Sequence, residues 1–405
     1  MRILVLHSLS DSFAGYSANI DHFQHEVTYV GTADRLTTVP HSVPLRAIER
    51  SGSGDTAQEV LSAVAGRPAP DVVLALSEFD LIPAAHIRES LGVPGPTVRE
   101  VLPSRDKVVM KSAVAAAGVR VPRFMSLASA VRCGASSLPW TGSTVVKPVA
   151  GASSAGVVTF PSPGTALEAV SEAGSSGQVE DWEIEEFVDG RVLHIDGLMA
   201  GGTLAVIQAS RYVGTCLGYA YGAPLGSIQT ETGGALADWS LSCLKAVGII
   251  DGPFHLEAIE SSDGLVFLEV AARCGSGGTM DTFELATGVR LPGAAIRLAV
   301  EGASALPPPR LPEAEERFGW FTFPGHTLGT PYCRISGLDE FRDGPLIRRW
   351  VERRNAKPLR PTISYAFAHV PLGGLIGPGS TESLERYLTD LFESVRVLPH
   401  GPSAE

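Results

Sequence analysis

The sequence has 405 residues with 44 acidic and 32 basic side chains, so its net charge is −12. Proteins that neutralise many nucleic-acid phosphates are normally basic, so this acidic chain is not expected to bind nucleic acid. The length and the 44% share of hydrophobic residues fit two or three packed globular domains, and no stretch reaches the ~18 apolar residues that cross a bilayer.

The chain begins with an apolar run, Ile3–Leu6, that is too short for a signal peptide and predicts a first strand. Its five cysteines are scattered and form no C-x-x-C pair. Scattered, unpaired cysteines are typical of reduced thiols inside the cell. We therefore expect a cytoplasmic protein with no membrane partner.

Residues 1–103 alternate between strand and helix signals. The candidates are a strand at 3–6, a helix at 55–64, a strand at 71–76 and a helix at 82–91. Gly92 follows the second helix, where glycine commonly ends a helix. Alternating strands and helices predict an open, largely parallel sheet.

The rest of the chain mixes helices, strands and loops. A helix is predicted from Ser104 to Ala117, with Ser104 as its N-cap and Gly118 as its end. Further candidates are strands at 144–147, 182–188 and 362–370, a small-residue loop at 150–156, a hairpin of 254–259 with 265–271, a Pro- and Ala-rich linker at 303–312, and a helix at 381–395.

Lys147 ends an apolar strand and is followed by Pro148 and the small-residue loop 150–156. A lysine at a strand end can simply extend its ammonium to water, and the loop could be a surface linker. However, such loops also let backbone N–H groups approach phosphate oxygens closely. A lysine beside this loop therefore outlines a phosphate-binding site, although the G-x-x-x-x-G-K-[ST] pattern is absent.

The two arms of the predicted hairpin each carry a glutamate. A three-residue loop, Ser262–Gly264, would pair 261 with 265, 259 with 267 and Glu257 with Glu269. Like charges directly opposite each other are destabilising, so a nucleotide-bound Mg²⁺ is the favoured explanation. The alternative is a solvated sheet face, and a one-residue slip of register would weaken the argument.

Arg273 follows the second glutamate by four residues and enters a glycine-rich stretch. Beside a metal site, an arginine can stabilise negative charge that develops in a transition state. Gly275, Gly277 and Gly278 could bring backbone N–H donors close to a substrate. The alternative is a surface arginine next to a flexible turn.

Taken in order, these segments resemble the ATP-grasp superfamily between residues 104 and 300. The resemblance rests on Asp106-Lys107, Ala117-Gly118-Val119, Val121-Pro122, Val145-Val146-Lys147-Pro148, Glu185-Glu186-Phe187-Val188-Asp189-Gly190, Gly252-Pro253-Phe254-His255-Leu256-Glu257 and Leu268-Glu269-Val270-Ala271-Ala272-Arg273. Each segment is weak by itself, whereas their joint order and spacing are specific.

The resemblance implies a binding site for ATP and Mg²⁺. Lys107 and Lys147 would contact the α/β phosphates, and a lid loop with Ser153, Ser154 and Gly156 would lie over them. A hinge would run from Glu185 through Glu186 and Phe187 to Val188. Glu257 and Glu269 would bind Mg²⁺, and Arg273 would hold the acyl phosphate or tetrahedral intermediate. In the hinge, backbone groups of Glu186 and Val188 would read the adenine edge.

Two positions depart from the family pattern. The ribose-binding glutamate is replaced by Val192, and His194 is the candidate to substitute for it. The asparagine two residues after the second metal glutamate is Ala271. The second Mg²⁺ would then lose a protein ligand, which water could replace.

The expected fold is α/β: an ATP-grasp core at 104–302, preceded by an open, Rossmann-like α/β domain at 1–103. The core would contain a small lid subdomain at about 115–188 followed by the metal-binding and catalytic part. An α+β segment at 303–405 would pack on the core. By analogy of fold, the protein is expected to be a homodimer.

The resemblance implies a carboxylate–amine ligase that forms an amide through an acyl phosphate and releases ADP and phosphate. The length and C-terminal extension look like L-amino-acid ligases of natural-product biosynthesis. Glu78 and Arg211 are further candidates for contacts with the small carboxylate and amine substrates. The alternatives are a kinase or carboxylase on the same fold, or a protein that binds ATP without turnover.

Overall fold

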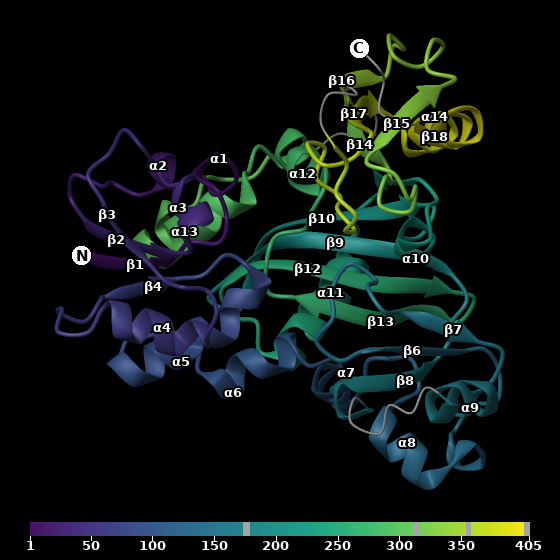
Figure 1. The fold of residues 1–405 in the computed structure, drawn as a ribbon, viewed down its shortest axis with the longest axis horizontal. Helices are drawn as coiled ribbons and strands as arrows, with labels where there is room; N and C mark the ends of the chain where they lie inside the picture. The colour runs from purple at the N-terminus through teal and green to yellow at the C-terminus, as the bar shows by residue number, and fades with distance from the viewer. Residues whose placement is uncertain (173–178, 311–315, 354–357, 401–405) are drawn as a thin grey trace.

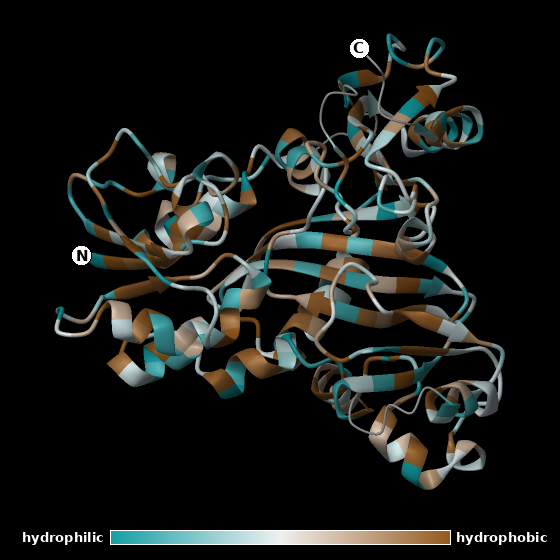
Figure 2. Cartoon of the chain, viewed as in Figure 1, coloured by the Kyte–Doolittle hydropathy of each residue, from teal (hydrophilic) through white to brown (hydrophobic). Residues whose placement is uncertain are grey.

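The computed structural model describes residues 1–172, 179–310, 316–353 and 358–400, and three groups of elements are visible in Figure 1. Within these residues, no helix has both the length and the apolar character needed to cross a membrane. Figure 2 shows hydrophilic and hydrophobic bands alternating along the strands of the largest sheet, as expected where one face is buried and the other lines a site.

The N-terminal part is a four-stranded parallel sheet in the order β3-β2-β1-β4, as the alternating pattern predicted. Its strands are β1 (Arg2–Leu6), β2 (Glu26–Gly31), β3 (Arg46–Glu49) and β4 (Val72–Leu74). One face packs on α4 (Thr56–Ala63) and α5 (Leu81–Leu91). Gly92 ends α5 with a left-handed φ of 65°, which confirms its predicted role.

The other face of this sheet is covered partly by α13 (Leu291–Glu301), which belongs to a much later part of the chain. Figure 1 shows α13 in green among the purple N-terminal elements. Ile296 and Val300 of α13 are buried in one cluster with Ile3 and Val5. The N-terminal sheet is therefore held directly against a segment that follows the hairpin of residues 252–271.

A second, antiparallel sheet has the order β5-β8-β6-β7. It consists of β5 (Phe124–Ser126), β6 (Thr144–Pro148), β7 (Val158–Phe160) and β8 (Trp182–Glu186), with α8 (Leu127–Cys133) and α9 (Pro163–Glu172) against it. The predicted strands at 144–147 and 182–188 are thus confirmed, except that the second strand ends at Glu186.

The largest sheet is antiparallel, with eight strands in the order β13-β12-β9-β10-β11-β14-β17-β16. Its strands are β9 (Arg191–Ala200), β10 (Thr203–Val213), β11 (Leu225–Gln229), β12 (Gly252–Ser261), β13 (Gly264–Ala271), β14 (Arg317–Phe323), β16 (Ile347–Glu352) and β17 (Leu372–Gly379). The C-terminal segment therefore extends the sheet of the core. The predicted division at 103 and 302 remains a prediction.

Helices α7 (Lys107–Ala116) and α11 (Gly234–Val247) cover one face of the large sheet. The prediction that Ser104 is the N-cap of α7 is wrong. The N-cap is Asp106, whose carboxylate accepts the backbone N–H groups of Val108 and Val109. A carboxylate two residues later satisfies the free N–H groups better because it is charged and complements the helix dipole.

The C-terminal segment adds α14 (Thr381–Ser394), which packs against the large sheet, and a two-stranded sheet of β15 (Tyr332–Ser336) with β18 (Arg396–His400). The predicted strand at 362–370 is wrong, because these residues form no strand and β17 begins only at Leu372. The alternating side chains Ile363, Tyr365 and Phe367 instead pack in a separate cluster. Short helices occur at α1 (Asp11–Ala14), α2 (Tyr16–Asn19), α3 (Ala33–Leu36), α6 (Val98–Val101), α10 (Cys216–Ala220) and α12 (Thr279–Thr287).

Candidate active site

A cavity of about 290 Å³ lies between the second sheet and the large sheet, and we call it the inter-sheet cavity. Its lining residues include apolar side chains from both sheets, namely Val145, Val188, Val192, Ile259 and Leu268. Its polar lining includes Lys107, Lys147, Glu185, Glu257 and Glu269. Most of the residues that the sequence singled out therefore meet in one place.

Glu257 and Glu269 face each other across β12 and β13, as predicted. The route to this register differs from the prediction. The hairpin loop has two residues, because Ser261 pairs with Gly264, and a β-bulge then leaves Leu268 without a partner on β12. The two deviations from the predicted register cancel at Glu257. The bulge also places Leu268 and Glu269, which are adjacent in sequence, in the same cavity wall.

Two lysines surround this carboxylate pair. Lys107, the first residue of α7, lies 3.2 Å from the Glu269 carboxylate and donates to the Gly151 carbonyl at 2.7 Å. Lys147 lies 2.6 Å from the Glu185 carboxylate. Burial raises the pKa of Glu269, but Lys107 and Lys147 outweigh this effect and hold the pKa at about 2. Glu269 is therefore ionised at neutral pH.

The sequence reasoning missed two members of this charged network. Lys111 is fully buried on α7, lies 2.8 Å from Glu183 and also contacts Glu185. Their spacing in the sequence could have indicated both residues. Lys111 lies one helical turn after Lys107, and Glu183 lies two residues before Glu185, on the same face of β8. The Glu185 side chain is consequently bound by two lysines, which fixes the start of the predicted hinge.

The predicted hinge lines the inter-sheet cavity with Glu185, Glu186, Phe187 and Val188. The N–H of Glu186 donates to the Arg123 carbonyl at 2.9 Å, and its carboxylate pairs with the same arginine. This N–H is therefore not free for adenine. The contact of adenine with backbone groups of Glu186 and Val188 stays a prediction.

The small-residue loop covers the cavity mouth. Ser153 and Ser154 line it and have left-handed φ angles of 59° and 54°, which are uncommon for non-glycine residues. Gly156 does not line the cavity; a Cβ there would lie 3.2 Å from both Pro148 and Trp182. The predicted ligand contact of Gly156 is therefore corrected to a packing role.

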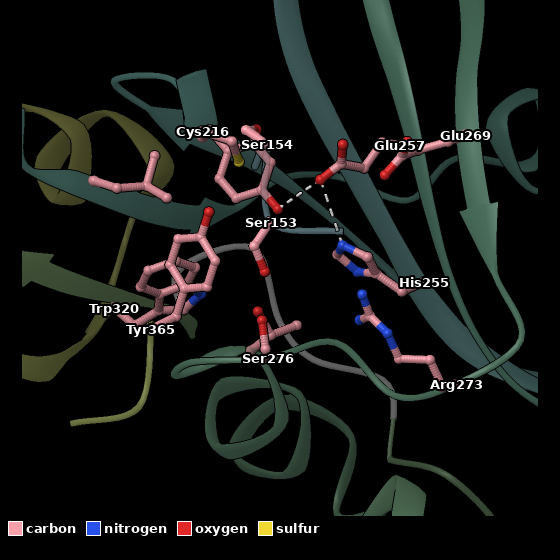
Figure 3. A pocket seen from close by; sticks show the side chains of 13 residues that line it. Ser153, Ser154, Cys216, His255, Glu257, Glu269, Arg273, Ser276, Trp320 and Tyr365 are labelled. Atoms are coloured by element: carbon pink, nitrogen blue, oxygen red, sulfur yellow. Dashed lines mark hydrogen bonds and ion pairs between the residues drawn. The ribbon is translucent and has the colours of Figure 1, made fainter. Parts of the chain in front are cut away.

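A second cavity of about 50 Å³, the side pocket, adjoins the first (Figure 3). Both cavities are lined by Ser153, Ser154, Cys216, Glu257 and Glu269. The rest of its lining is Tyr212, Leu225, His255, Arg273, Ser276, Thr279, Trp320 and Tyr365. Of these, the sequence had indicated only Arg273, because the others come from elements far apart in the chain.

Arg273 points into the side pocket and is held from behind by the N-terminal part. Its Nε donates to the Glu78 carboxylate at 3.0 Å, and Arg105 binds the other oxygen of that carboxylate. Glu78 does not line the side pocket, but it lines a small cavity with Lys107, Glu269 and Arg273. It orients the Arg273 guanidinium, and its predicted substrate contact stays a prediction.

The glycines after Arg273 allow close packing and do not line the pocket. A Cβ on Gly278 would lie 2.4 Å from Trp320, and one on Gly275 would lie 2.7 Å from the Asp196 carboxylate. Gly277 has a left-handed φ of 65°. The predicted substrate contacts of Gly275, Gly277 and Gly278 are therefore corrected, while Ser276 between them does line the pocket.

His194 is buried behind the pocket, so the predicted ribose contact is wrong. One ring nitrogen is hydrogen-bonded to Asp196 at 2.6 Å and the other to Ser227 at 2.6 Å. The second oxygen of Asp196 binds His255 at 2.9 Å. Burial lowers the pKa of His255, but Asp196 outweighs this effect and raises it to about 9, so His255 presents a cationic ring to the pocket.

Arg211 also lies away from both cavities. It belongs to β10, where the next residue, Tyr212, lines the side pocket. Successive side chains of a strand point to opposite faces, so Arg211 points to the other face and binds Glu385 of α14 at 2.6 Å. The predicted substrate contact of Arg211 is wrong for this reason.

No family model matches the sequence. Over 281 residues, the chain is 23% identical to the L-arginine-specific L-amino acid ligase of Bacillus subtilis. This match covers 67% of the chain and 65% of the relative, so the chain spans somewhat less than two thirds of that protein.

Solved structures with similar folds cover nearly the whole chain. The L-amino acid ligase of Bacillus licheniformis has a TM-score of 0.71 at 20% identity, and the match covers 99% of this chain and 98% of that one. The phosphoribosylglycinamide synthetase of Anaerococcus prevotii has a TM-score of 0.66 at 11% identity, with 98% and 99% coverage. The N5-carboxyaminoimidazole ribonucleotide synthetase of Thermotoga maritima reaches 0.62 at 15% identity, again with 98% and 99%. The chain therefore has the ATP-grasp fold that these solved structures share.

Proposed function

We propose that the protein is an ATP-dependent carboxylate–amine ligase that forms an amide or peptide bond and releases ADP and phosphate. The observation that carries this proposal is the facing pair Glu257 and Glu269, which lies where the inter-sheet cavity and the side pocket meet. A nucleotide in one cavity and an acid in the other would have their reacting groups on either side of this pair.

The residues present fit ATP and Mg²⁺. Two facing carboxylates offer the oxygen ligands that Mg²⁺ prefers. A bound Mg²⁺ would also explain why like charges are held opposite each other. Lys107 and Lys147 line the inter-sheet cavity and would bind phosphate oxygens, while the apolar wall with Val188 and Leu268 would hold a flat base. When bound, MgATP would supply the phosphoryl group that converts a carboxylate oxygen into a good leaving group.

The chain's own residues would then act mainly by positioning and electrostatics. Arg273, oriented by Glu78, would hold the negative charge that develops on the reacting acid. The N–H groups of the loop with Ser153 and Ser154 would cover the phosphates and exclude water. Small acids and amines, amino-acid-like and used in biosynthesis, are the proposed substrates. A cytoplasmic homodimer is proposed as well.

The test is to incubate the protein with ATP, Mg²⁺ and pools of amino acids, and to measure phosphate, pyrophosphate and new masses. Amine-dependent phosphate release with a condensed product is expected. Phosphate without a condensed product would indicate a kinase or carboxylase, and pyrophosphate would indicate an adenylating enzyme. ATP binding without turnover of any pool would favour a non-catalytic protein.

The metal assignment is tested by Glu269→Gln, which keeps the shape but removes the charge. We expect kcat/KM to fall by about 10²-fold or more, with weaker Mg²⁺-dependent ATP binding. The matched control is Glu260→Gln, on the exposed part of the same hairpin and outside both cavities, which should leave activity unchanged. If Glu269→Gln bound MgATP as tightly as the parent, the assignment would be wrong.

A further inference from the structure

The two ends of the side pocket differ in chemistry. Figure 3 shows His255 and Arg273 at one end, and Trp320 and Tyr365 together at the other. We propose, building on the ligase function above, that the aromatic end is a specificity subsite for one of the two substrates. It takes a compact, uncharged side chain that carries a hydrogen-bond acceptor.

Two buried donors at the aromatic end lack acceptors among the described residues. Trp320 is 2% exposed and lines the pocket, and its indole Nε1 has no hydrogen-bond partner among the described residues. The Tyr365 hydroxyl is also buried and has no hydrogen-bond partner among the described residues. An indole N–H can only donate, and a buried donor without an acceptor is costly. A substrate group that accepts from both would satisfy them.

At this end, Tyr212, Cys216 and Leu225 pack with Trp320 and Tyr365 in one apolar cluster. At its border, the Glu257 carboxylate accepts a hydrogen bond from the Tyr212 hydroxyl at 2.9 Å and would repel an anionic group. Aromatic faces can attract cations. Here, however, a guanidinium or ammonium group cannot accept a hydrogen bond, so it would leave both donors unpaired. The subsite is therefore better matched to a neutral acceptor.

The side pocket is small. It has about 50 Å³, and a water-sized group needs ~10–15 Å³ of such space, so about three to five heavy atoms fit in it. Trp320 packs closely on Gly278, where an added Cβ would lie 2.4 Å from it. Large side chains are thus excluded as well.

The experiment titrates L-threonine, L-valine and L-arginine into the protein saturated with ADP and Mg²⁺, using calorimetry. Threonine and valine have nearly the same shape, and only threonine carries the acceptor. We expect the parent to bind threonine about 10-fold or more tightly than valine, with arginine weakest. Trp320→Phe and Tyr365→Phe, which each remove one donor and keep the ring, should reduce this preference to about 3-fold or less.

Trp350→Phe is the matched control, because the Trp350 Nε1 also has no partner among the described residues, yet Trp350 lies outside the pocket. It should keep the threonine preference. Tightest binding of arginine, an unchanged preference in both pocket variants, or no binding of any probe would each overturn the inference. A normal threonine preference without ATP turnover would instead sink the ligase proposal and leave the subsite intact.

Discussion

The inter-sheet cavity and the side pocket share one wall but are built from different kinds of side chain. The inter-sheet cavity depends on buried charges, with Lys111 and Lys147 bound to Glu185. The distinctive wall of the side pocket is neutral and aromatic, with Trp320 and Tyr365. A buried charge needs a partner of opposite sign, whereas a neutral wall needs only shape and hydrogen bonds. Substitutions in the first cavity should therefore cost stability, and those in the second should change selectivity.

The largest expected effect comes from breaking the charged network at Lys111. Lys111→Met keeps the volume but leaves the Glu183 and Glu185 carboxylates short of a cation in a buried site. We expect the free energy of unfolding to fall by about 3–5 kcal/mol, measured by urea denaturation. Lys245→Met, at an exposed position of α11, is the control and should change it by less than about 0.5 kcal/mol. Equal small effects at both positions would contradict the charged-network account.

An intermediate effect is expected from pH. Burial raises the pKa of Glu185, but Lys111 and Lys147 outweigh it, so the folded pKa lies below the ordinary value of 4.5. A depressed pKa contributes stability that is fully present above 4.5 and is lost as the pH falls toward the folded value. Glu185→Gln should therefore flatten the acid limb of the unfolding free energy below about pH 4.5, compared with the parent.

Trp320→Phe serves as the comparison for this pH experiment, since it removes no titrating group. Its unfolding free energy should follow the parent's pH dependence with a constant offset. An acid limb as steep in Glu185→Gln as in the parent would show that the carboxylate does not carry this dependence.

The smallest effect is expected at Arg211, which lies in neither cavity. Arg211→Met removes a partly exposed ion pair with Glu385, for which about 0–1 kcal/mol of stability is typical. Activity should stay within about 2-fold of the parent, because the side chain lies on the face opposite Tyr212. A change in KM for the acid or amine, measured by phosphate release, would restore Arg211 as a substrate residue.

Part of the molecule follows from the sequence alone, and the physical reasons are local. The pattern of β1, α4, β4 and α5 predicted a parallel sheet, and Gly92 ends its helix because only glycine adopts a left-handed φ without cost. The pairing of Glu257 with Glu269 was expected from the hairpin pattern, although two deviations from the predicted register had to cancel for it to hold. The buried pair of Lys111 and Glu183 was missed.

The rest was decided by tertiary structure, because it depends on which strands become neighbours. Trp320 reaches the side pocket because β14 pairs with β11. Trp320 lies opposite Ser227 of β11, and Ser227 lies opposite Tyr212 of β10. No local pattern links residues so far apart. Likewise the alternation at 362–370 predicted a strand, yet the Ser364 carbonyl accepts from the Tyr219 hydroxyl and Tyr365 stacks on the same ring. The sequence by itself predicted the parallel N-terminal sheet and the facing glutamates, because both follow from local patterns. The assembled large sheet decided which side chains surround the side pocket, because that depends on strands that are neighbours in space and far apart in the chain.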